Sequence, residues 1–282
     1  MFLTGVLGLV LLVGGCSGGA GGTDNGSVHK VAGGKAAGGE AADGKAAGAS
    51  AEGSASLTGS VTVSAAASLT ESFTRIKDDF VQANPGSEVI INFGSSGQLA
   101  TQIHSGAPVD VAAFADTTPM DALAKAGLIS GEATTFALNE LVIVTKPRNP
   151  QRVKSLADLA DVGTISLCND NAPCGKFADR ILSGAGVDIP VSSITRGMDV
   201  KATLAAVIEG DAVAGIVYVT DAASAGDRVE SVRIPGAQNV TASYPIGVVS
   251  ESSNRSLADA FVRYVTGVKG QAVLKKFGFL AP

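Results

Sequence analysis

The sequence predicts an α/β protein built as two lobes. Patterns typical of buried strands alternate with helix patterns from about Ser60 onward, and the alternation restarts after Lys146-Pro147. Alternating strands and helices favour a largely parallel sheet with helices on both faces. With 282 residues, the chain can bury one large core or two smaller ones. We therefore expect two α/β lobes joined by two crossing strands.

The first lobe is organised around the stretch Val61–Phe73, in which a strand runs directly into a helix. Its first half is small and β-branched, as expected of a buried strand. Ser68 and Glu71 then have the spacing of a helix-capping box, and Ser95 and Gln98 repeat this spacing after the second strand. Strands are expected at residues 61–67, 88–93, 110–115 and 140–145, with helices after the first three.

The second lobe repeats the alternation. Strands are expected at residues 164–168, 214–219, 229–234 and 245–249, the last of which carries the chain back. Helices are expected to begin near Ser155, Pro173 and Asp199, with Asp199 as an N-cap. Two final helices, over 256–266 and 270–277, have no sheet of their own and should return to the first lobe. We place the first lobe at residues 60–145 and 247–282, and the second at 146–246.

Four strand-to-helix junctions suggest a site for a small anion. A helix that follows a strand directly leaves its first N–H groups exposed at the strand's carboxyl end, where the helix dipole is positive. Such helix ends, together with a hydroxyl such as that of Ser68, can bind an anion. In a two-lobed α/β protein, the carboxyl ends of the strands face one another across a cleft. We therefore expect the junctions to converge on one ligand.

The composition argues against several other classes of function. Charged residues make up 17% of the chain and the net charge is −5, so there is no indication of a basic surface for nucleic acid. The absence of Trp and the presence of only three Tyr argue against a stacking platform for sugars or bases. A net negative charge does not prevent anion binding, because local dipoles dominate at contact distance.

The N-terminus has the pattern of an export signal. Residues 2–13 are apolar, too few to span a bilayer, and end in Val13-Gly14-Gly15-Cys16. This run resembles a bacterial lipoprotein signal, although no Lys or Arg precedes it. The resemblance implies cleavage before Cys16, a lipid on its sulfur, and a place in the cell envelope on the outer face of the cytoplasmic membrane. An ordinary secretory signal is the alternative. Residues 17–59 are rich in Gly and Ala, so we expect a disordered tether.

Two cysteines remain besides Cys16. Cys168 and Cys174 form an even count in an exported protein, which allows either a disulfide or two free thiols. A disulfide would close a small loop and stabilise the fold by roughly 2 kcal/mol. No His or acidic pair flanks these cysteines at ligand spacing, which disfavours a metal site.

Several motifs, in order along the chain, resemble those of one protein family. They are Ala65-Ala66-Ala67-Ser68-Leu69, Phe93-Gly94-Ser95-Ser96-Gly97, Gly106-Ala107-Pro108-Val109-Asp110 and Gly215-Ile216-Val217-Tyr218. From about Ser60 to Phe279, the chain resembles the ModA-type molybdate-binding proteins of bacterial ABC importers. The resemblance implies a two-lobed periplasmic-binding-protein fold of type II, with the ligand in the interlobe cleft.

The resemblance also implies molybdate or tungstate as the ligand, with no cofactor, no catalysis and no metal beyond that of the oxyanion. Carried over residue by residue, Ser68 and Ser96 would each give a hydroxyl and a backbone N–H. Cys174 and Val200 would each give a backbone N–H, and Tyr218 would give its phenolic hydroxyl. Cys174 departs from the small residue usual in the family. The implied partners are the ABC permease and its ATPase, and the implied state is a monomer.

The residues disfavour an enzyme and an iron-binding protein. An enzyme is disfavoured, because Gly94-Ser95-Ser96-Gly97 is not the nucleophile motif G-x-S-x-G and only His104 is available in the folded part. Iron binding would need paired tyrosines, and Tyr218, Tyr244 and Tyr264 are not adjacent. The main alternative is another tetrahedral anion, such as sulfate, thiosulfate or phosphate.

Charged residues near the predicted cleft receive no ligand role. We expect Arg196, Lys176 and Lys201 to be solvated. Asp116 and Asp221, which each follow a strand, are expected to cap turns rather than to bind a metal.

Overall fold

The structure is a computed structural model that describes residues 57–282. The predicted signal segment (1–16), the predicted lipidation of Cys16 and nearly all of the predicted tether (17–59) lie outside the described residues. Within residues 57–282, no helix is long and apolar enough to cross a membrane.

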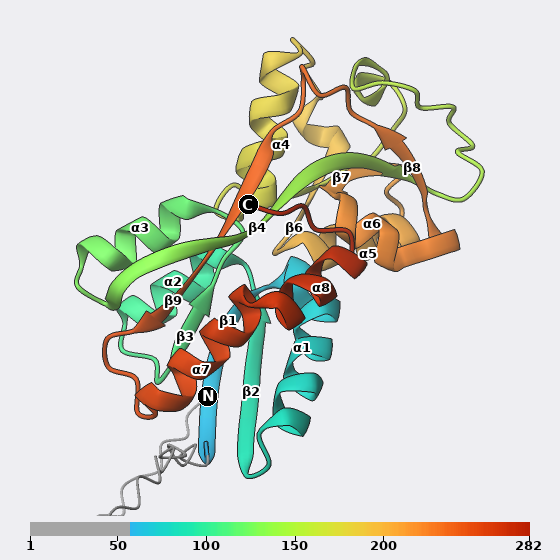
Figure 1. Cartoon of the computed structure of the whole chain (residues 1–282). Helices are drawn as coiled ribbons and strands as arrows, with labels where there is room; N and C mark the ends of the chain where they lie inside the picture. The colour runs from blue at the N-terminus through green and yellow to red at the C-terminus, as the bar shows by residue number, and fades with distance from the viewer. Residues whose placement is uncertain (1–56) are drawn as a thin grey trace, which may run out of the picture. The chain divides into compact units, whose positions relative to one another are not determined.

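The described chain forms a nine-stranded sheet with helices packed on it. The strand order is β2-β1-β3-β9-β4-β7-β5-β6, and β8 pairs with β4. The strands are β1 (Gly59–Ala66), β2 (Ser87–Gly94), β3 (Val111–Ala113), β4 (Ile129–Thr145), β5 (Ile165–Cys168), β6 (Ile194–Gly197), β7 (Ala214–Tyr218), β8 (Glu230–Arg233) and β9 (Thr241–Val249). Figure 1 shows two groups of elements, with β4 and β9 running between them.

We call the group around β1, β2 and β3 the first lobe and the group around β5, β6 and β7 the second lobe. The first lobe contains α1 (Thr70–Ala83), α2 (Ser96–His104), α3 (Thr117–Lys125), α7 (Arg255–Thr266) and α8 (Val268–Lys276). The second lobe contains α4 (Pro173–Gly184), α5 (Val200–Ile208) and α6 (Val219–Ala225). Short 3₁₀ turns are η1 (Ala67–Leu69), η2 (Ala157–Ala160), η3 (Val191–Ser193) and η4 (Gly226–Arg228).

Strand direction differs between the lobes and the connection. Within the lobes, β1 is parallel to β2 and β3, and β5 is parallel to β6 and β7. The crossing strands β4 and β9 pair antiparallel with each other, β9 with β3, and β4 with β7 and β8. The prediction of a largely parallel sheet is therefore wrong for the connection. The chain leaves the first lobe on β4 and returns on β9, so these two strands must run in opposite directions.

The C-terminal helices pack against elements of the first lobe. Helix α8 packs against α1, and α7 packs against β9 and β1. Aromatic rings join α7 to α1: the Phe80 and Phe261 centroids lie 5.4 Å apart, and those of Phe73 and Phe261 lie 6.2 Å apart. Edge-to-face pairs of this kind add about 0.5–1.5 kcal/mol to the burial of the rings.

Several elements differ from the sequence predictions. Strand β4 begins at Ile129, eleven residues before the predicted strand at 140–145, and its early part alternates exposed and half-buried residues. The helix expected near Ser155 is only the turn η2. Strand β6 and helix α6 were not predicted. The predicted lobe boundary at 145/146 coincides with the end of β4, whereas the one at 246/247 falls within β9.

Candidate anion-binding site

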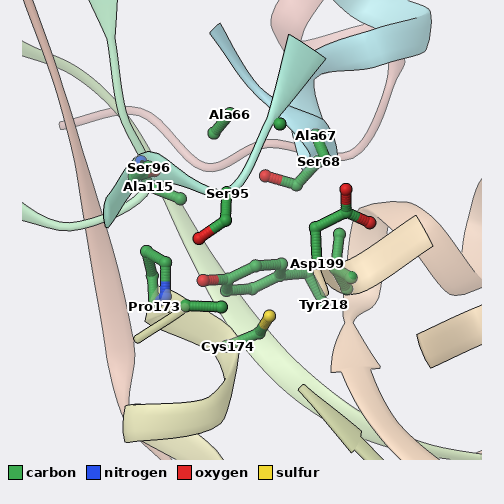
Figure 2. A pocket seen from close by; sticks show the side chains of 13 residues that line it. Ala66, Ala67, Ser68, Ser95, Ser96, Ala115, Pro173, Cys174, Asp199 and Tyr218 are labelled. Atoms are coloured by element: carbon green, nitrogen blue, oxygen red, sulfur yellow. Dashed lines mark hydrogen bonds between the residues drawn. The ribbon is translucent and has the colours of Figure 1, made fainter. Parts of the chain in front are cut away.

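A small cavity lies where the two lobes meet, at the carboxyl ends of the parallel strands (Figure 2). Its volume is only about 10 Å³, roughly the space that one water molecule needs. The first lobe lines it with Ala66, Ala67, Ser68, Gly94, Ser95, Ser96 and Ala115, and the second lobe with Ala172, Pro173, Cys174, Asp199, Val200 and Tyr218. The five residues carried over from the resemblance (Ser68, Ser96, Cys174, Val200 and Tyr218) are all among them.

The ends of short helices form much of the cavity wall. Helix α2 begins at Ser96, α4 at Pro173 and α5 at Val200, each directly after a strand or a short loop. The first N–H groups of a helix have no partner within it and carry the positive end of its dipole. Because proline has no N–H, Cys174 supplies the first donor of α4. Three helix dipoles thus point their positive ends at one small space.

Two hydroxyl groups reach the cavity without a hydrogen-bond partner. Tyr218 is 1% exposed and Ser95 is 3% exposed, and neither hydroxyl has a partner. Figure 2 shows both hydroxyls pointing into the same space. Leaving a buried hydroxyl unpaired costs about 1–3 kcal/mol, so such a group is expected to bond a ligand or water. Burial, together with neighbouring Tyr244, raises the pKa of Tyr218 well above its usual value, which keeps this phenol a neutral donor.

The other two serines have one partner each. The Ser96 hydroxyl oxygen accepts a hydrogen bond from the Ala115 N–H at 3.1 Å, which leaves its own hydrogen free. The Ser68 hydroxyl lies 2.9 Å from the hydroxyl of Tyr244. A serine hydroxyl can accept and donate at the same time, so both remain able to donate to a ligand.

Neither predicted capping box forms. Ser68 lies in η1, and α1 begins only at Thr70 with no side-chain cap. Ser95 precedes α2, but its hydroxyl makes no bond to that helix. Glu71, the expected partner of Ser68, bonds Lys201 of the second lobe instead. These hydroxyls are therefore not used up by the helices that they precede.

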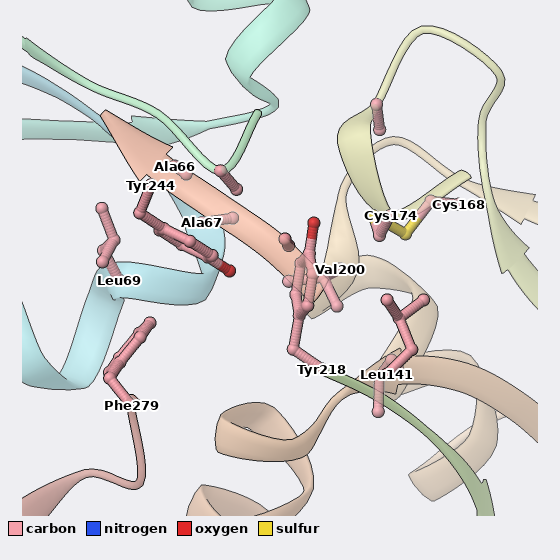
Figure 3. Close-up of a cluster of buried hydrophobic side chains, with 14 of the residues drawn as sticks. Ala66, Ala67, Leu69, Leu141, Cys168, Cys174, Val200, Tyr218, Tyr244 and Phe279 are labelled. Atoms are coloured by element: carbon pink, nitrogen blue, oxygen red, sulfur yellow. A yellow bond between two sulfur atoms is a disulfide. The ribbon is translucent and has the colours of Figure 1, made fainter. Parts of the chain in front are cut away.

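A disulfide lies beside the cavity. In the structure, Cys168 and Cys174 are joined, with their sulfur atoms 1.98 Å apart (Figure 3). The bond ties the end of β5 to the first turn of α4, where Cys174 lines the cavity. It thus limits how far the Cys174 N–H can move.

No cationic side chain lines the cavity. Of its lining residues only Asp199 is charged, and Asp199 caps α5 by accepting from the Ala202 N–H at 3.0 Å, as predicted. Across residues 57–282, no cluster of His, Cys, Asp and Glu suitable for a metal ion is present. The available groups are uncharged N–H and O–H donors.

Lys201 lies close by in a charged cluster that joins the lobes. Its Nζ lies 2.7 Å from both carboxylate oxygens of Glu71 on α1 and 2.8 Å from Asp221 Oδ1 on α6. Burial alone would lower the pKa of Lys201, but Asp221 and Glu71 raise it overall. The expectations that Lys201 is solvated and that Asp221 caps a turn are therefore wrong. Lys201 lies between the lobes because it pairs with Glu71 and Asp221, which are distant from it in the sequence.

The remaining charged residues are structural. Arg196 pairs with Asp170 and Asp179, so it is not simply solvated as expected. Lys176 lies 3.9 Å from Asp116, a loose and half-exposed pair. Asp116 caps α3 by accepting from the Thr118 N–H, as predicted. None of these side chains lines the cavity.

The lobes touch on either side of the cavity. On one side is the Glu71–Lys201 ion pair. On the other, Gly97 of α2 lies so close to the loop after β5 that an added Cβ would stand 2.5 Å from the Asn171 carbonyl oxygen. The described molecule is therefore in a closed form.

Ser95 is the cavity residue that sequence reasoning missed. Its motif, Gly94-Ser95-Ser96-Gly97, holds two adjacent serines, and only the second was selected. Because the chain turns from strand to helix there, both can reach the cavity. Its position next to Ser96 is the feature of the sequence from which Ser95 could have been predicted as a cavity residue.

A cavity between two α/β lobes joined by crossing strands is the arrangement of the two-lobed solute-binding proteins. Residues 61–280 match the family model "Bacterial extracellular solute-binding protein". The chain is 42% identical over 224 residues to the molybdate-binding protein ModA of Mycobacterium tuberculosis, covering 79% of this chain and 85% of that protein. The chain therefore belongs to the bacterial extracellular solute-binding proteins, in the family of the ModA proteins.

Two further relatives agree with this assignment. The putative ABC transporter substrate-binding lipoprotein YvgL of Bacillus subtilis is 30% identical over 79% of this chain and 86% of its own length. The periplasmic molybdate-binding protein of Azotobacter vinelandii has the same fold, with a TM-score of 0.69 and 21% identity over 79% of this chain and 99% of that one. The predicted family and the predicted α/β periplasmic-binding-protein fold are confirmed. The chain is a binding protein and not an enzyme.

Proposed function

We propose that this protein binds molybdate or tungstate outside the cytoplasm and delivers it to the permease of an ABC importer. The observation that carries the proposal is the set of uncharged donors around the cavity, two of them buried hydroxyls without a partner. The ModA relatives, at up to 42% identity, support molybdate as the anion. Ser68, Ser96, Cys174, Val200 and Tyr218 are the proposed ligand residues, and Ser95 is added to them.

The donor set suits a tetrahedral oxyanion with two negative charges. Such an anion has only acceptor oxygens, and the cavity offers N–H and O–H donors from both lobes. Hydrogen bonds to a charged group contribute about 1.5–3 kcal/mol each. Five to seven of them suffice for a dissociation constant in the micromolar range or below, about −8 kcal/mol, after the cost of closing the lobes.

Neutral donors also explain how the protein distinguishes among anions. Hydrogen phosphate carries a proton that needs an acceptor. Asp199 is the only carboxylate lining the cavity, and it already caps α5. A fully deprotonated oxyanion avoids that cost, since buried polar groups without partners are destabilising.

Isothermal titration calorimetry of the purified protein tests the proposal. We expect molybdate and tungstate to bind at micromolar concentration or below, and sulfate and phosphate at least tenfold more weakly. Sulfate binding as tightly as molybdate would assign the site to another tetrahedral anion. Absence of binding for all four anions would refute the proposal.

We further propose that Cys16 carries a lipid that anchors the protein to the outer face of the cytoplasmic membrane. The apolar run ending in Val13-Gly14-Gly15-Cys16 and the word lipoprotein in the name of the YvgL relative support this anchor. Cells expressing the full chain should incorporate labelled palmitate into it. The Cys16→Ala variant should incorporate none, and equal labelling of the two would contradict the anchor.

A further inference from the structure

A buried chain of hydrogen bonds leads away from Ser68, behind the cavity. Ser68 lies 2.9 Å from the hydroxyl of Tyr244 on β9, and Tyr244 accepts a hydrogen bond from the Asn139 side-chain amide on β4 at 3.3 Å. The same amide nitrogen donates to Thr220 Oγ1 on α6 at 2.9 Å. Each of these four residues is at most 4% exposed, so water does not compete for their bonds. The chain joins the first lobe, both crossing strands and the second lobe.

The direction of this chain is fixed at Asn139. Its side-chain oxygen accepts a hydrogen bond from the Glu140 N–H at 2.9 Å, so the amide nitrogen must face Tyr244 and Thr220. An amide nitrogen only donates. The Tyr244 oxygen is therefore an acceptor in its bond with Asn139, and the phenolic hydrogen remains for another partner.

Ser68, whose hydroxyl oxygen lies 2.9 Å from that of Tyr244, is a partner that this hydrogen can reach. If Tyr244 donates to Ser68, the serine hydrogen is left to point elsewhere. If Ser68 instead donated to Tyr244, the serine would turn its lone pairs toward the cavity. An anion in the cavity would be repelled by those lone pairs. A bound anion therefore selects the first arrangement.

The Tyr244 ring is also held in place by packing. Its centroid lies 5.3 Å from that of Phe279 and 5.9 Å from that of Tyr218, both at steep angles (Figure 3). Burial raises the pKa of the Tyr244 phenol, which keeps it protonated and able to donate. A rigid ring can hold its hydroxyl at one position without further loss of side-chain entropy.

We propose that Tyr244 and Asn139 are positioning residues that turn the Ser68 hydroxyl into a donor toward the bound oxyanion. This inference rests on the proposed function of the cavity and deepens it. Because Tyr244 already donates to one of the two lone pairs of the Ser68 oxygen, Ser68 is a poorer acceptor for a protonated anion. Tyr244 and Asn139 thereby also favour fully deprotonated oxyanions over hydrogen phosphate.

A double-mutant cycle tests whether Tyr244 acts through Ser68. Molybdate affinity is measured by calorimetry for the wild type, Ser68→Ala, Tyr244→Phe and the double variant. We expect Tyr244→Phe to weaken binding about tenfold in the wild type and less than about twofold in the Ser68→Ala background. Equal losses in both backgrounds would overturn the proposal, because a merely structural tyrosine would act independently of Ser68.

Anion selectivity supplies the second measurement. Hydrogen phosphate competes for molybdate binding at pH 8, and its affinity relative to molybdate is compared between the wild type and Tyr244→Phe. In Tyr244→Phe, the serine lone pair that Tyr244 no longer occupies should raise the ratio of phosphate affinity to molybdate affinity several-fold. An unchanged ratio would contradict the role in selectivity, since a general loss of packing would weaken both anions alike.

Two more variants complete the design. Tyr264→Phe removes the same atom from α7, away from the cavity, and should leave molybdate affinity unchanged. Asn139→Leu removes the donor to Tyr244 and should weaken binding about threefold, again only where Ser68 is present. Asn139→Leu takes the place of Tyr244→Phe in the cycle if Tyr244→Phe does not fold. An equal loss of molybdate affinity with and without the Ser68 hydroxyl would refute the proposal.

The two proposals fail in different ways. A wild type that binds no molybdate would refute the proposed function itself. Additive losses of affinity in a protein that does bind molybdate would refute only the role of Tyr244 and Asn139.

Discussion

The cavity and the Glu71–Lys201–Asp221 cluster both lie between the lobes, but they hold opposite kinds of polar group. The cavity offers uncharged donors, and two of its hydroxyls have no partner. The cluster consists of charged groups that pair with one another, with Lys201 Nζ within 2.8 Å of both carboxylates. The cavity hydroxyls have no partner of their own, whereas the charges of the cluster already pair with one another, although Asp221 Oδ2 has no hydrogen-bond partner. The cavity groups are thus placed to bind a ligand, whereas the cluster groups are placed to hold the lobes together.

Removing a donor from the cavity should have the largest effect. Tyr218→Phe deletes a buried hydroxyl that has no other partner, so only the ligand loses a bond. We expect molybdate affinity to fall by about 10- to 100-fold, as for a hydrogen bond to a charged group. Titration calorimetry measures the change, with Tyr264→Phe as the matched control. An affinity within twofold of the wild type would remove Tyr218 from the site.

Blocking closure without touching a donor should have the next largest effect. In Gly97→Ala, the new methyl group would lie 2.5 Å from the Asn171 carbonyl oxygen, so the lobes cannot approach as closely. We expect about tenfold weaker binding of molybdate. Gly184→Ala is the control, because an added Cβ at Gly184 meets nothing within 4 Å. Equal affinities for the two variants would mean that this contact does not limit closure.

The buried carboxyl of Asp221 in the charged cluster should make the free energy of unfolding depend on pH. Burial raises the pKa of Asp221 to about 6 against the lowering effect of Lys201, whereas its ordinary value is 3.8. The ionised form therefore costs folding free energy above about pH 6, and this cost is relieved as the pH falls from 6 toward 4. When the pH is lowered from 7 to 5, the free energy of unfolding of the wild type should rise by on the order of 1 kcal/mol relative to that of Asp221→Asn. Urea unfolding of both proteins at the two pH values measures the gain, and a constant difference would contradict the shifted pKa.

Neutralising the other end of the cluster should have the smallest effect. Glu71→Gln keeps the size of the side chain but removes the charge that reaches Lys201 from the first lobe. Lys201 keeps Asp221, and the Glu71–Lys201 pair is partly exposed, so we expect only a two- to fivefold loss of molybdate affinity, diminishing at high salt. Glu88→Gln, on an exposed position of β2, serves as the control. A loss as large as that for Tyr218→Phe would place Glu71 within the binding machinery.

Much of the fold follows from local patterns in the sequence. The apolar runs around Val61 and Ile216 predict buried strands, and each becomes part of one. The long strand β4 was recognised only over its last six residues, because its start alternates polar and small residues that resemble a loop. Helix α6 was missed because it has only seven residues and follows β7 without a break.

Site residues could be predicted where a short motif joins a strand to a helix. They could not be predicted where contacts form between segments that are distant in the sequence. Ser68 and Ser96 lie in motifs that join a strand to a helix, and both line the cavity. The same reasoning assigned Glu71 to a local cap, whereas the structure pairs it with a lysine 130 residues away. Tyr244 was considered only as an iron ligand, since its bond to Ser68 spans 176 residues. Such contacts depend on tertiary packing, which local spacing does not encode.

The ribbon of β4 and β9 has a thermodynamic consequence. These strands bond to each other along their length and also to strands of both lobes, so neither lobe has a complete sheet without them. Heating should therefore unfold residues 57–282 in a single cooperative transition in scanning calorimetry, with no separate unfolding of one half. A molybdate ion that touches only a few residues should then raise the melting temperature of the entire domain, by mass action on one folded state.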